Sequence, residues 1–255
     1  MTLPPEIIGL ILEFVQSQSD IISAACGSHT LQREAERLLY RKLQVKIDHR
    51  DPKFEAVLKR PEFRGSLVVH LEIYSRNSKT LRWDTILNYA QHLSVLGMRY
   101  HGPAQLLSTY PFQLREFETE LDVDDNMLRF LASQPSITIL HLHSLDSPIS
   151  RPLSTKILPR LQELTCMTKS LRHILPGRHI IKLKPLGVIE PENYQPLCAS
   201  LKEVAGTLQD LNVSLESANA EILSQLVAVT PKLKRIQLFD CSVEVQSRIS
   251  LTTWY

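Results

Sequence analysis

Glycine is scarce in this chain, and the scarcity excludes several kinds of site. The 255 residues include only 8 glycines, and no two of them are spaced as G-x-G. Dinucleotide-binding fingerprints and the turn that carries a hydrolase serine both need such closely spaced glycines. After the closest pair, Gly97 and Gly102, the lysine and hydroxyl residue of a phosphate-binding loop are missing. The sequence therefore predicts no nucleotide site and no cofactor.

Paired cysteines, a charge excess and long apolar runs are missing as well. The four cysteines form no C-x-x-C pair, which argues against a zinc clip or a disulfide framework and favours a reducing compartment. The 29 basic and 27 acidic residues leave a net charge of +2, so nothing points to nucleic acid or to an anionic membrane. The longest early apolar run lies between Glu6 and Glu13 and is too short to cross a membrane. We expect a cytoplasmic protein, or one shared between cytoplasm and nucleus.

The first fifty residues carry the pattern of three short helices. In LPPEIIGLILEFV, at residues 3–15, prolines suit the helix start and apolar residues recur at three- and four-residue spacing. A second helix is expected over 21–25 after Asp20 as cap, and a third over 31–43 after Thr30. In the third helix the pattern turns Ala35 and its apolar neighbours inward and Glu36 outward. Such a small module has more apolar residues than it can bury, so its first helix docks either on the rest of the chain or on a partner.

This opening resembles an F-box of the kind common in fungal proteins. The resemblance rests on the Leu3-Pro4-Pro5-Glu6-Ile7 start, a short helix with Cys26, and the later RLLYR at residues 37–41. The tryptophan that often follows the cysteine in this family is absent. The resemblance implies binding to the Skp-type adaptor of a cullin-RING ubiquitin ligase through Leu3, Pro4, Ile7, Ile8, Ile11 and Leu12.

The following two hundred residues contain a recurring apolar-x-x-apolar-x-apolar pattern. It starts at residues 68, 93, 114, 137, 161, 180, 208 and 233, at intervals of 19 to 28 residues, which fits a strand-plus-helix repeat. Because one such unit cannot cover its own apolar edge, stacked units are expected to share a core. An ordinary α/β sandwich is the alternative. The pattern resembles the leucine-rich repeat family, in which strands form the concave face of a curved solenoid.

These observations predict an α/β protein in three parts. Residues 1–47 would form the F-box-like module, 48–66 a connection, and 67–255 a solenoid of about eight irregular repeats. Only about fifteen residues follow the last repeat, and Val243, Val245, Ile249, Leu251 and Trp254 are candidates for a short cap; a truncated array is the alternative.

Side chains between the apolar positions of each strand are expected on the concave face. They are His70, Glu72, Tyr74, Val95, Arg99, Glu116, Glu118, Glu120, His141, His143, Glu163, Met167, Lys182, Lys184, Asp210, Asn212, Arg235, Gln237 and Phe239. The acidic strand around Glu118, with Glu163 nearby, suggests a surface for a basic segment of a target protein, unless the face is simply polar. The predicted target-binding residues are Glu116, Glu118, Glu120, His141, His143, Glu163, Lys182, Lys184 and Arg235.

No catalytic constellation is visible, and His141 and His143 lack the further ligands of a metal site. The resemblances together imply a non-catalytic substrate receptor of an SCF-type ubiquitin ligase, which would hold an unknown protein target. Two alternatives remain: a leucine-rich interaction scaffold without a ubiquitin role, and a small-molecule enzyme on a parallel sheet. The scarcity of glycine disfavours the enzyme. Whether Ile7, Ile8, Ile11 and Leu12 face the repeats or solvent distinguishes the receptor from the scaffold.

Overall fold

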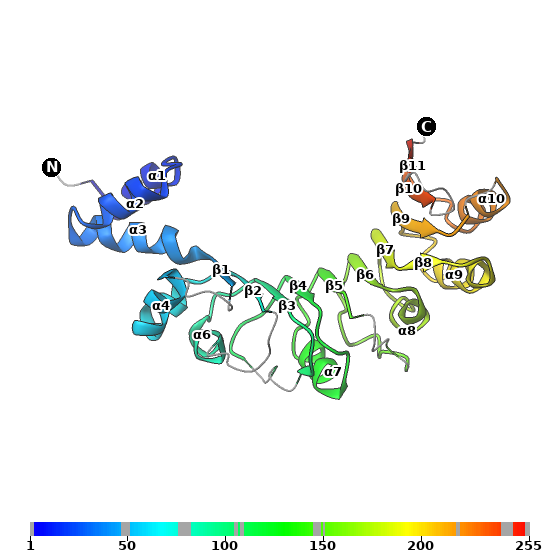
Figure 1. The fold of residues 1–255 in the computed structure, drawn as a ribbon, viewed down its shortest axis with the longest axis horizontal. Coiled ribbons are helices and arrows are strands. Elements are labelled where there is room, and N and C mark those ends of the chain that lie inside the picture. The colour runs from blue at the N-terminus through cyan, green and yellow to red at the C-terminus, as the bar shows by residue number, and fades with distance from the viewer. Residues whose placement is uncertain are drawn as a thin grey trace. The chain divides into compact units, whose positions relative to one another are not determined.

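The computed structural model shows an α/β protein in which helices lie against one face of parallel strands (Figure 1). It describes residues 3–46, 52–75, 83–104, 107, 110–144, 149, 151–217, 220–240 and 247–252. The predicted α/β class is confirmed. Packing divides the chain into two compact units, one of Met1–Tyr100 with Tyr110–Leu114 and one of His101–Thr109 with Arg115–Tyr255. The three-part division predicted from the sequence stays a prediction.

The first unit begins with helices and continues into parallel strands in the order β1-β2-β3. Its elements are α1 (Pro5–Glu13), α2 (Gln18–Ala25), α3 (His29–Arg41), β1 (Lys42–Lys46), α4 (Pro52–Lys59), α5 (Pro61–Arg64), the 3-10 helix η1 (Gly65–Leu67), β2 (His70–Tyr74), α6 (Trp83–Tyr89) and β3 (Val95–Arg99).

The three expected N-terminal helices are present, but two start earlier than predicted. The side chain of Ser17, not Asp20, caps α2, and the side chain of Ser28, not Thr30, caps α3 by accepting from the Leu31 amide at 3.2 Å. Capping places the hydroxyl just before the first turn, so a serine upstream takes the role and the predicted cap lies within the helix. The third helix also ends at Arg41, before the predicted Leu43.

Strand β1 follows α3 without a connecting loop and is absent from the prediction. Leu43 and Val45 are buried while the residues between them are exposed, and β1 pairs in parallel with β2. This alternation of apolar and polar residues is the signature of a half-buried strand. The helical module therefore continues directly into the sheet of its unit.

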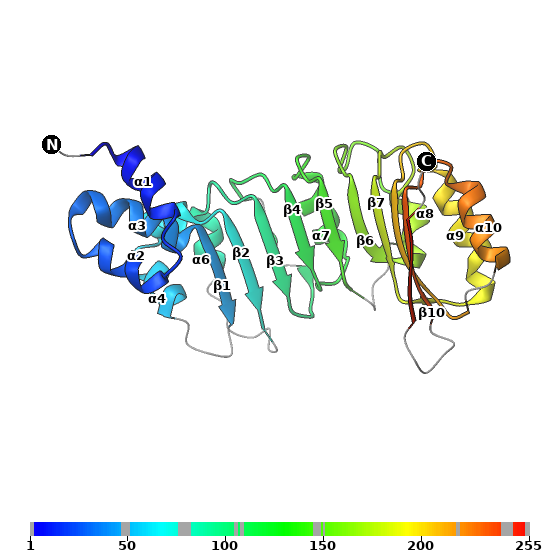
Figure 2. The ribbon, with the colours of Figure 1, turned by 90° about the horizontal axis from the view of Figure 1, so that it is seen from above.

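The second unit has the strand order β4-β5-β6-β7-β9-β10-β11, with β8 paired to β9. Figure 2 shows strands β4 to β7 side by side, and helices α7 to α10 lie to one side of the sheet in Figure 1. The elements are β4 (Glu116–Thr119), α7 (Asp125–Ala132), β5 (Ile139–Leu142), β6 (Glu163–Met167), η3 (Thr168–Ser170), α8 (Leu171–Ile174), β7 (Lys182–Leu186), β8 (Val188–Ile189), η4 (Pro191–Asn193), α9 (Tyr194–Lys202), β9 (Asp210–Leu215), α10 (Ala220–Val229), β10 (Arg235–Asp240) and β11 (Ser247–Thr252).

The recurring apolar pattern lies on the strands and forms the core of both units. Each of its positions is buried except Leu233, which is half-buried. Side chains between them reach the opposite face, as the alternating burial of β2, β4, β5, β7 and β9 shows. Two positions depart from this rule: Gly97 has no side chain and lies under Glu72, and Thr165 is buried. We call the side opposite the helices the sheet face.

A buried arginine holds together the stretch between β5 and β7, where α8 is only one turn long. The Arg178 guanidinium donates to four main-chain carbonyls: Ile174, Pro176 at 3.2 Å, Ser154 at 2.9 Å and Ile157 at 2.8 Å. These carbonyls belong to two segments, one before β6 and one after it, which are also joined by a hydrogen bond from the Leu153 amide to the His173 carbonyl at 2.9 Å. Arg178 thus links both segments through one buried side chain.

The end of the chain differs from the other strands. Strand β11 runs antiparallel to β10, with Ser247 opposite Asp240, and so covers the last parallel strand. Residues 249 and 251 of the predicted cap lie on β11, while Val243, Val245 and Trp254 lie outside the described residues.

Candidate interaction surfaces

Helix α1 packs on α3 through a close contact made possible by Gly9. A Cβ atom at this position would lie 3.0 Å from both Arg37 Nη2 and Glu34 Oε2, so a side chain would displace the ends of these two side chains. Arg37 donates to Glu34 Oε2 at 3.0 Å and lies 3.5 Å from Glu13 Oε1. These contacts fix which side of α1 turns inward.

The structure divides the predicted adaptor residues between two sides of the module. Leu12 is 6% exposed and belongs to the core, and Ile8 is half-buried. Ile7 and Ile11 are 42% and 52% exposed, and Leu3 and Pro4 are exposed as well. Leu12 is therefore unavailable to a partner while the module is folded, which corrects its assignment as a contact.

Two further apolar residues, Leu10 and Phe14, complete an exposed surface on α1. Phe14 is 86% exposed, and Leu10 is 54% exposed. Their spacing from Ile7 and Ile11 puts all four on one side of the helix. We call this set the α1 stripe: Leu3, Ile7, Leu10, Ile11 and Phe14. The predicted adaptor set omits Leu10 and Phe14, although the helical periodicity already places Leu10 on the apolar stripe, because periodicity shows that residues share a side without showing which side is free.

A polar cluster connects the helical module to the remainder of the first unit. Arg64 Nη2 donates to Glu36 Oε1 at 2.8 Å, and Arg64 Nη1 donates to the Ala56 carbonyl at 2.8 Å. The guanidinium also lies 5.1 Å from the centre of the Tyr40 ring. Glu36, predicted to face outward, is buried instead, because it meets this cation from 28 residues further along the chain.

On the sheet face of the first unit, Glu72 is the centre of a hydrogen-bond network. Its carboxylate accepts from Gln44 Nε2 at 2.8 Å and Tyr74 Oη at 2.6 Å, and it contacts His70 Nε2 at 2.7 Å. Burial alone would raise the pKa of Glu72, but the bonds from Tyr74 and His70 and the charges of His70 and Lys42 outweigh it. The pKa of Glu72 therefore lies below its ordinary value.

Two of the glutamates on and just after β4 lie beside histidines. Glu118 Oε1 lies 3.3 Å from His143 Nε2, and Glu120 Oε2 lies 3.9 Å from His101 Nε2. Glu116 is half-buried. Glu163, expected nearby, lies two strands away across Ile139, about 10 Å at the usual strand spacing. The four glutamates do not form one acidic cluster.

The two strand histidines point to different partners. Their ring centres lie 6.2 Å apart, and His141 Nδ1 lies 2.8 Å from Thr165 Oγ1. Over the part of the chain that the structure describes, no group of three or more histidine, cysteine, aspartate or glutamate side chains could hold a metal ion.

The charged residues on the last strands of the second unit face one another in pairs. Lys182 Nζ donates to Glu163 Oε1 at 2.7 Å, and Arg235 forms an ion pair with Asp210. Lys184 is exposed next to these pairs. A shallow groove of about 210 Å³ runs across this area.

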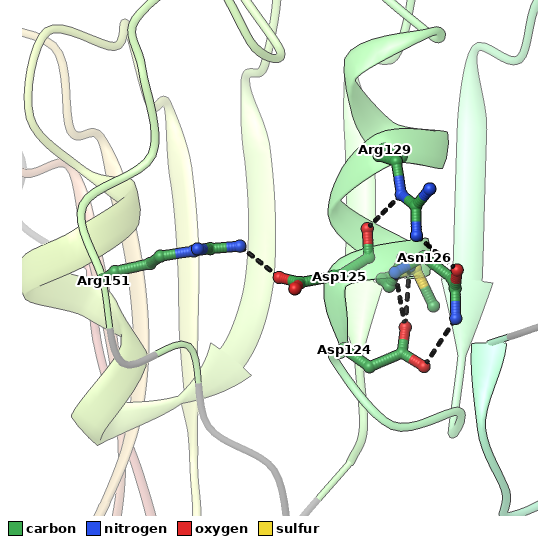
Figure 3. A network of polar contacts seen from close by, with 6 residues as sticks. Asp124, Asp125, Asn126, Arg129 and Arg151 are labelled. Atoms are coloured by element: carbon green, nitrogen blue, oxygen red, sulfur yellow. Dashed lines mark hydrogen bonds and ion pairs between the residues drawn. The ribbon is translucent and has the colours of Figure 1, made fainter.

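A second groove, of about 460 Å³, lies on the helix side of the second unit beside α7. Its floor is apolar, and Asp125, Arg129 and Arg151 stand at its rim. Figure 3 shows Asp124 capping α7 through the amides of Asn126 and Met127, both at 2.9 Å, and Arg151 paired with Asp125. Arg129 donates to Asn126 Oδ1 at 2.9 Å. The charged side chains at the rim are therefore bonded to other groups of the rim and of α7.

No model of a known protein family matches the chain, and no curated protein matches it. No helix within the described residues has the length and apolar character needed to span a membrane.

Proposed function

We propose that this protein is a non-catalytic substrate receptor of a cullin-RING ubiquitin ligase. It docks on a Skp-type adaptor through its F-box-like N-terminal module and holds a protein target on its leucine-rich-repeat-like sheet. The mechanism is proximity: holding the target near a ubiquitin-charged enzyme raises the effective concentration of its lysines. This role requires no reacting residue in the chain itself.

The α1 stripe is the observation that supports the proposal most. Three large apolar side chains, Ile7, Leu10 and Ile11, stand exposed on the nine-residue helix α1, and Leu3 and Phe14 are exposed at its two ends. Burying a single one of them is worth about 1.5–3 kcal/mol. The same helix already buries Leu12 against its own module. The stripe is therefore additional apolar surface, of the size that a protein partner covers.

The continuity of α3 and β1 supports the rest of the proposal. The cluster of Arg64, Glu36 and Tyr40, together with the pairing of β1 and β2, ties the helical module to a sheet. A receptor whose adaptor-binding helices continue into its sheet holds both in a fixed geometry within that unit. Proximity is most effective when little orientational freedom remains.

Co-purification with a Skp-type adaptor tests the proposal. The full chain should capture the adaptor, and Ile7→Glu/Ile11→Glu should lose capture by about a hundredfold or more, since two charges would enter an apolar interface. Both isoleucines are exposed, so this variant should fold normally. Substituting Leu12 instead would confuse lost docking with unfolding.

Ile22→Glu on α2 is the matched control, because Ile22 is also exposed but lies outside the α1 stripe. It should retain capture. Failure of the folded parent chain to capture the adaptor would contradict the proposal and leave the interaction scaffold as the better account.

A further inference from the structure

Four neighbouring strands of the second unit each carry a charged residue at their first sheet-face position. These four charges cancel. Glu163, Lys182, Asp210 and Arg235 lie in register on β6, β7, β9 and β10. Each acid pairs with a base: Glu163 with Lys182, and Asp210 with Arg235. This row is electrically balanced and offers a ligand little net attraction.

The next row along β5, β6, β7, β9 and β10 holds two hydrogen-bonded pairs and one lysine, Lys184. His141 and Thr165 bond to each other at 2.8 Å, and Asn212 Nδ2 donates to Gln237 Oε1 at 3.1 Å. Lys184 lies between these two hydrogen-bonded pairs and is exposed. Among the described residues no carboxylate forms an ion pair with its ammonium group, so a positive charge is left over in a row of hydrogen-bonding groups.

The backbone explains why a groove opens at this lysine. Strand β7 pairs with β9 only at Lys182 and Leu183, and Pro185, which lacks an N–H, follows Lys184. Strand β8 resumes the pairing at Ser214. The strands part beside Lys184, and the groove of about 210 Å³ includes Thr165, Asn212 and Gln237 in its lining.

We propose that this groove binds the carboxylate of an aspartate or glutamate in an extended segment of a partner protein, with Lys184 as its counter-charge. The lining has three basic side chains, Lys182, Lys184 and Arg235, against two acidic ones, Glu163 and Asp210, so its excess is positive. The side-chain amides of Asn212 and Gln237 beside a lysine suit a carboxylate, which accepts several hydrogen bonds. The proposal deepens the proposed function. It rests on that function only for the identification of the partner protein as a target of the ligase.

The preference is opposite to the one that the acidic strand suggested. Glu163 is paired with Lys182 and lies two strands away from Glu116, so the glutamates do not form one site for a basic segment. Lys184 retains its attraction because Thr165 and Asn212, which flank it in the row, carry no charge.

Peptide binding to the full chain tests the inference. The probes are three labelled peptides in which glutamate, glutamine or lysine alternates with alanine, and the measurement is fluorescence anisotropy at low ionic strength. The glutamate peptide should bind about tenfold more tightly than the other two, and added salt should weaken it. Lys184→Glu should remove that preference, and Lys184→Arg should keep it.

Lys232→Glu is the control, because it makes the same charge change at an exposed turn outside the groove. It should bind the glutamate peptide within about twofold of the parent. Equal binding of the three peptides, tighter binding of the lysine peptide, or unchanged binding by Lys184→Glu would each overturn the inference. Adaptor capture by Lys184→Glu is measured separately: peptide preference without capture would reject the ligase role and leave the groove standing.

Discussion

Replacing Arg178 tests whether one buried cation holds together the stretch before β7. Arg178 is 4% exposed, and Arg178→Met would keep much of its volume while leaving four carbonyl groups without their donor. A hydrogen bond to a charged group contributes about 1.5–3 kcal/mol, and such terms are not additive. Because burial lowers the pKa of Arg178, part of this gain is offset by desolvation. We expect a net loss of about 3–5 kcal/mol.

The loss is measured by urea and thermal unfolding of the full chain. For a chain of this size it corresponds to a fall of about 10 °C in Tm. Arg178→Lys should lose less, since it keeps the charge with fewer donors. Arg160→Met makes the same change at an exposed position and should change the free energy of unfolding by under about 0.5 kcal/mol. If Arg178→Met matched Arg160→Met, the assigned role of Arg178 would be refuted.

Three further predictions concern the rest of the fold. Glu36→Ala should destabilise the chain by about 2–4 kcal/mol in urea unfolding, because it leaves the guanidinium of Arg64 half-buried without its carboxylate; Arg33→Ala, at an exposed site on the same helix, should change stability little. Since its folded pKa is lowered, Glu72 stabilises the protein above its ordinary pKa, and this contribution is lost as the pH falls through the folded value. Glu72→Gln should therefore show a weaker loss of stability on acidification than the parent, and equal losses would contradict the network. Gly177→Ala should destabilise more than Gly206→Ala in thermal unfolding, because Gly177 has φ +72° and its Cβ would lie 2.7 Å from Thr155, whereas nothing lies near Gly206.

The strand positions could be predicted because the information is local. An apolar-x-apolar alternation fixes which side chains share a face whatever the neighbouring strand is. The burial of the recurring positions and the exposure of residues such as Lys184 follow from that rule alone. The short strand β1 obeys it too, and its Leu-x-Val alternation was obscured by the helix that precedes it.

The pairing of charges could not be predicted in the same way. Glu163 and Lys182 meet because their strands stack in register, and their separation of 19 positions in sequence does not encode that register. Glu36 illustrates the same limit, since its helix position predicts exposure and a distant arginine buries it. On α1, Gly9 is the available signal: a glycine inside a helix marks a close approach, and it identifies the side that faces α3.

Calorimetric titration of the full chain with a purified Skp-type adaptor tests the central claim most directly. We expect saturable one-to-one binding with a negative heat-capacity change, because the α1 stripe leaves water on docking. The same titration of the folded Ile7→Glu/Ile11→Glu variant should show no binding. Absence of binding by the folded parent chain, or equal binding by the variant, would contradict the account.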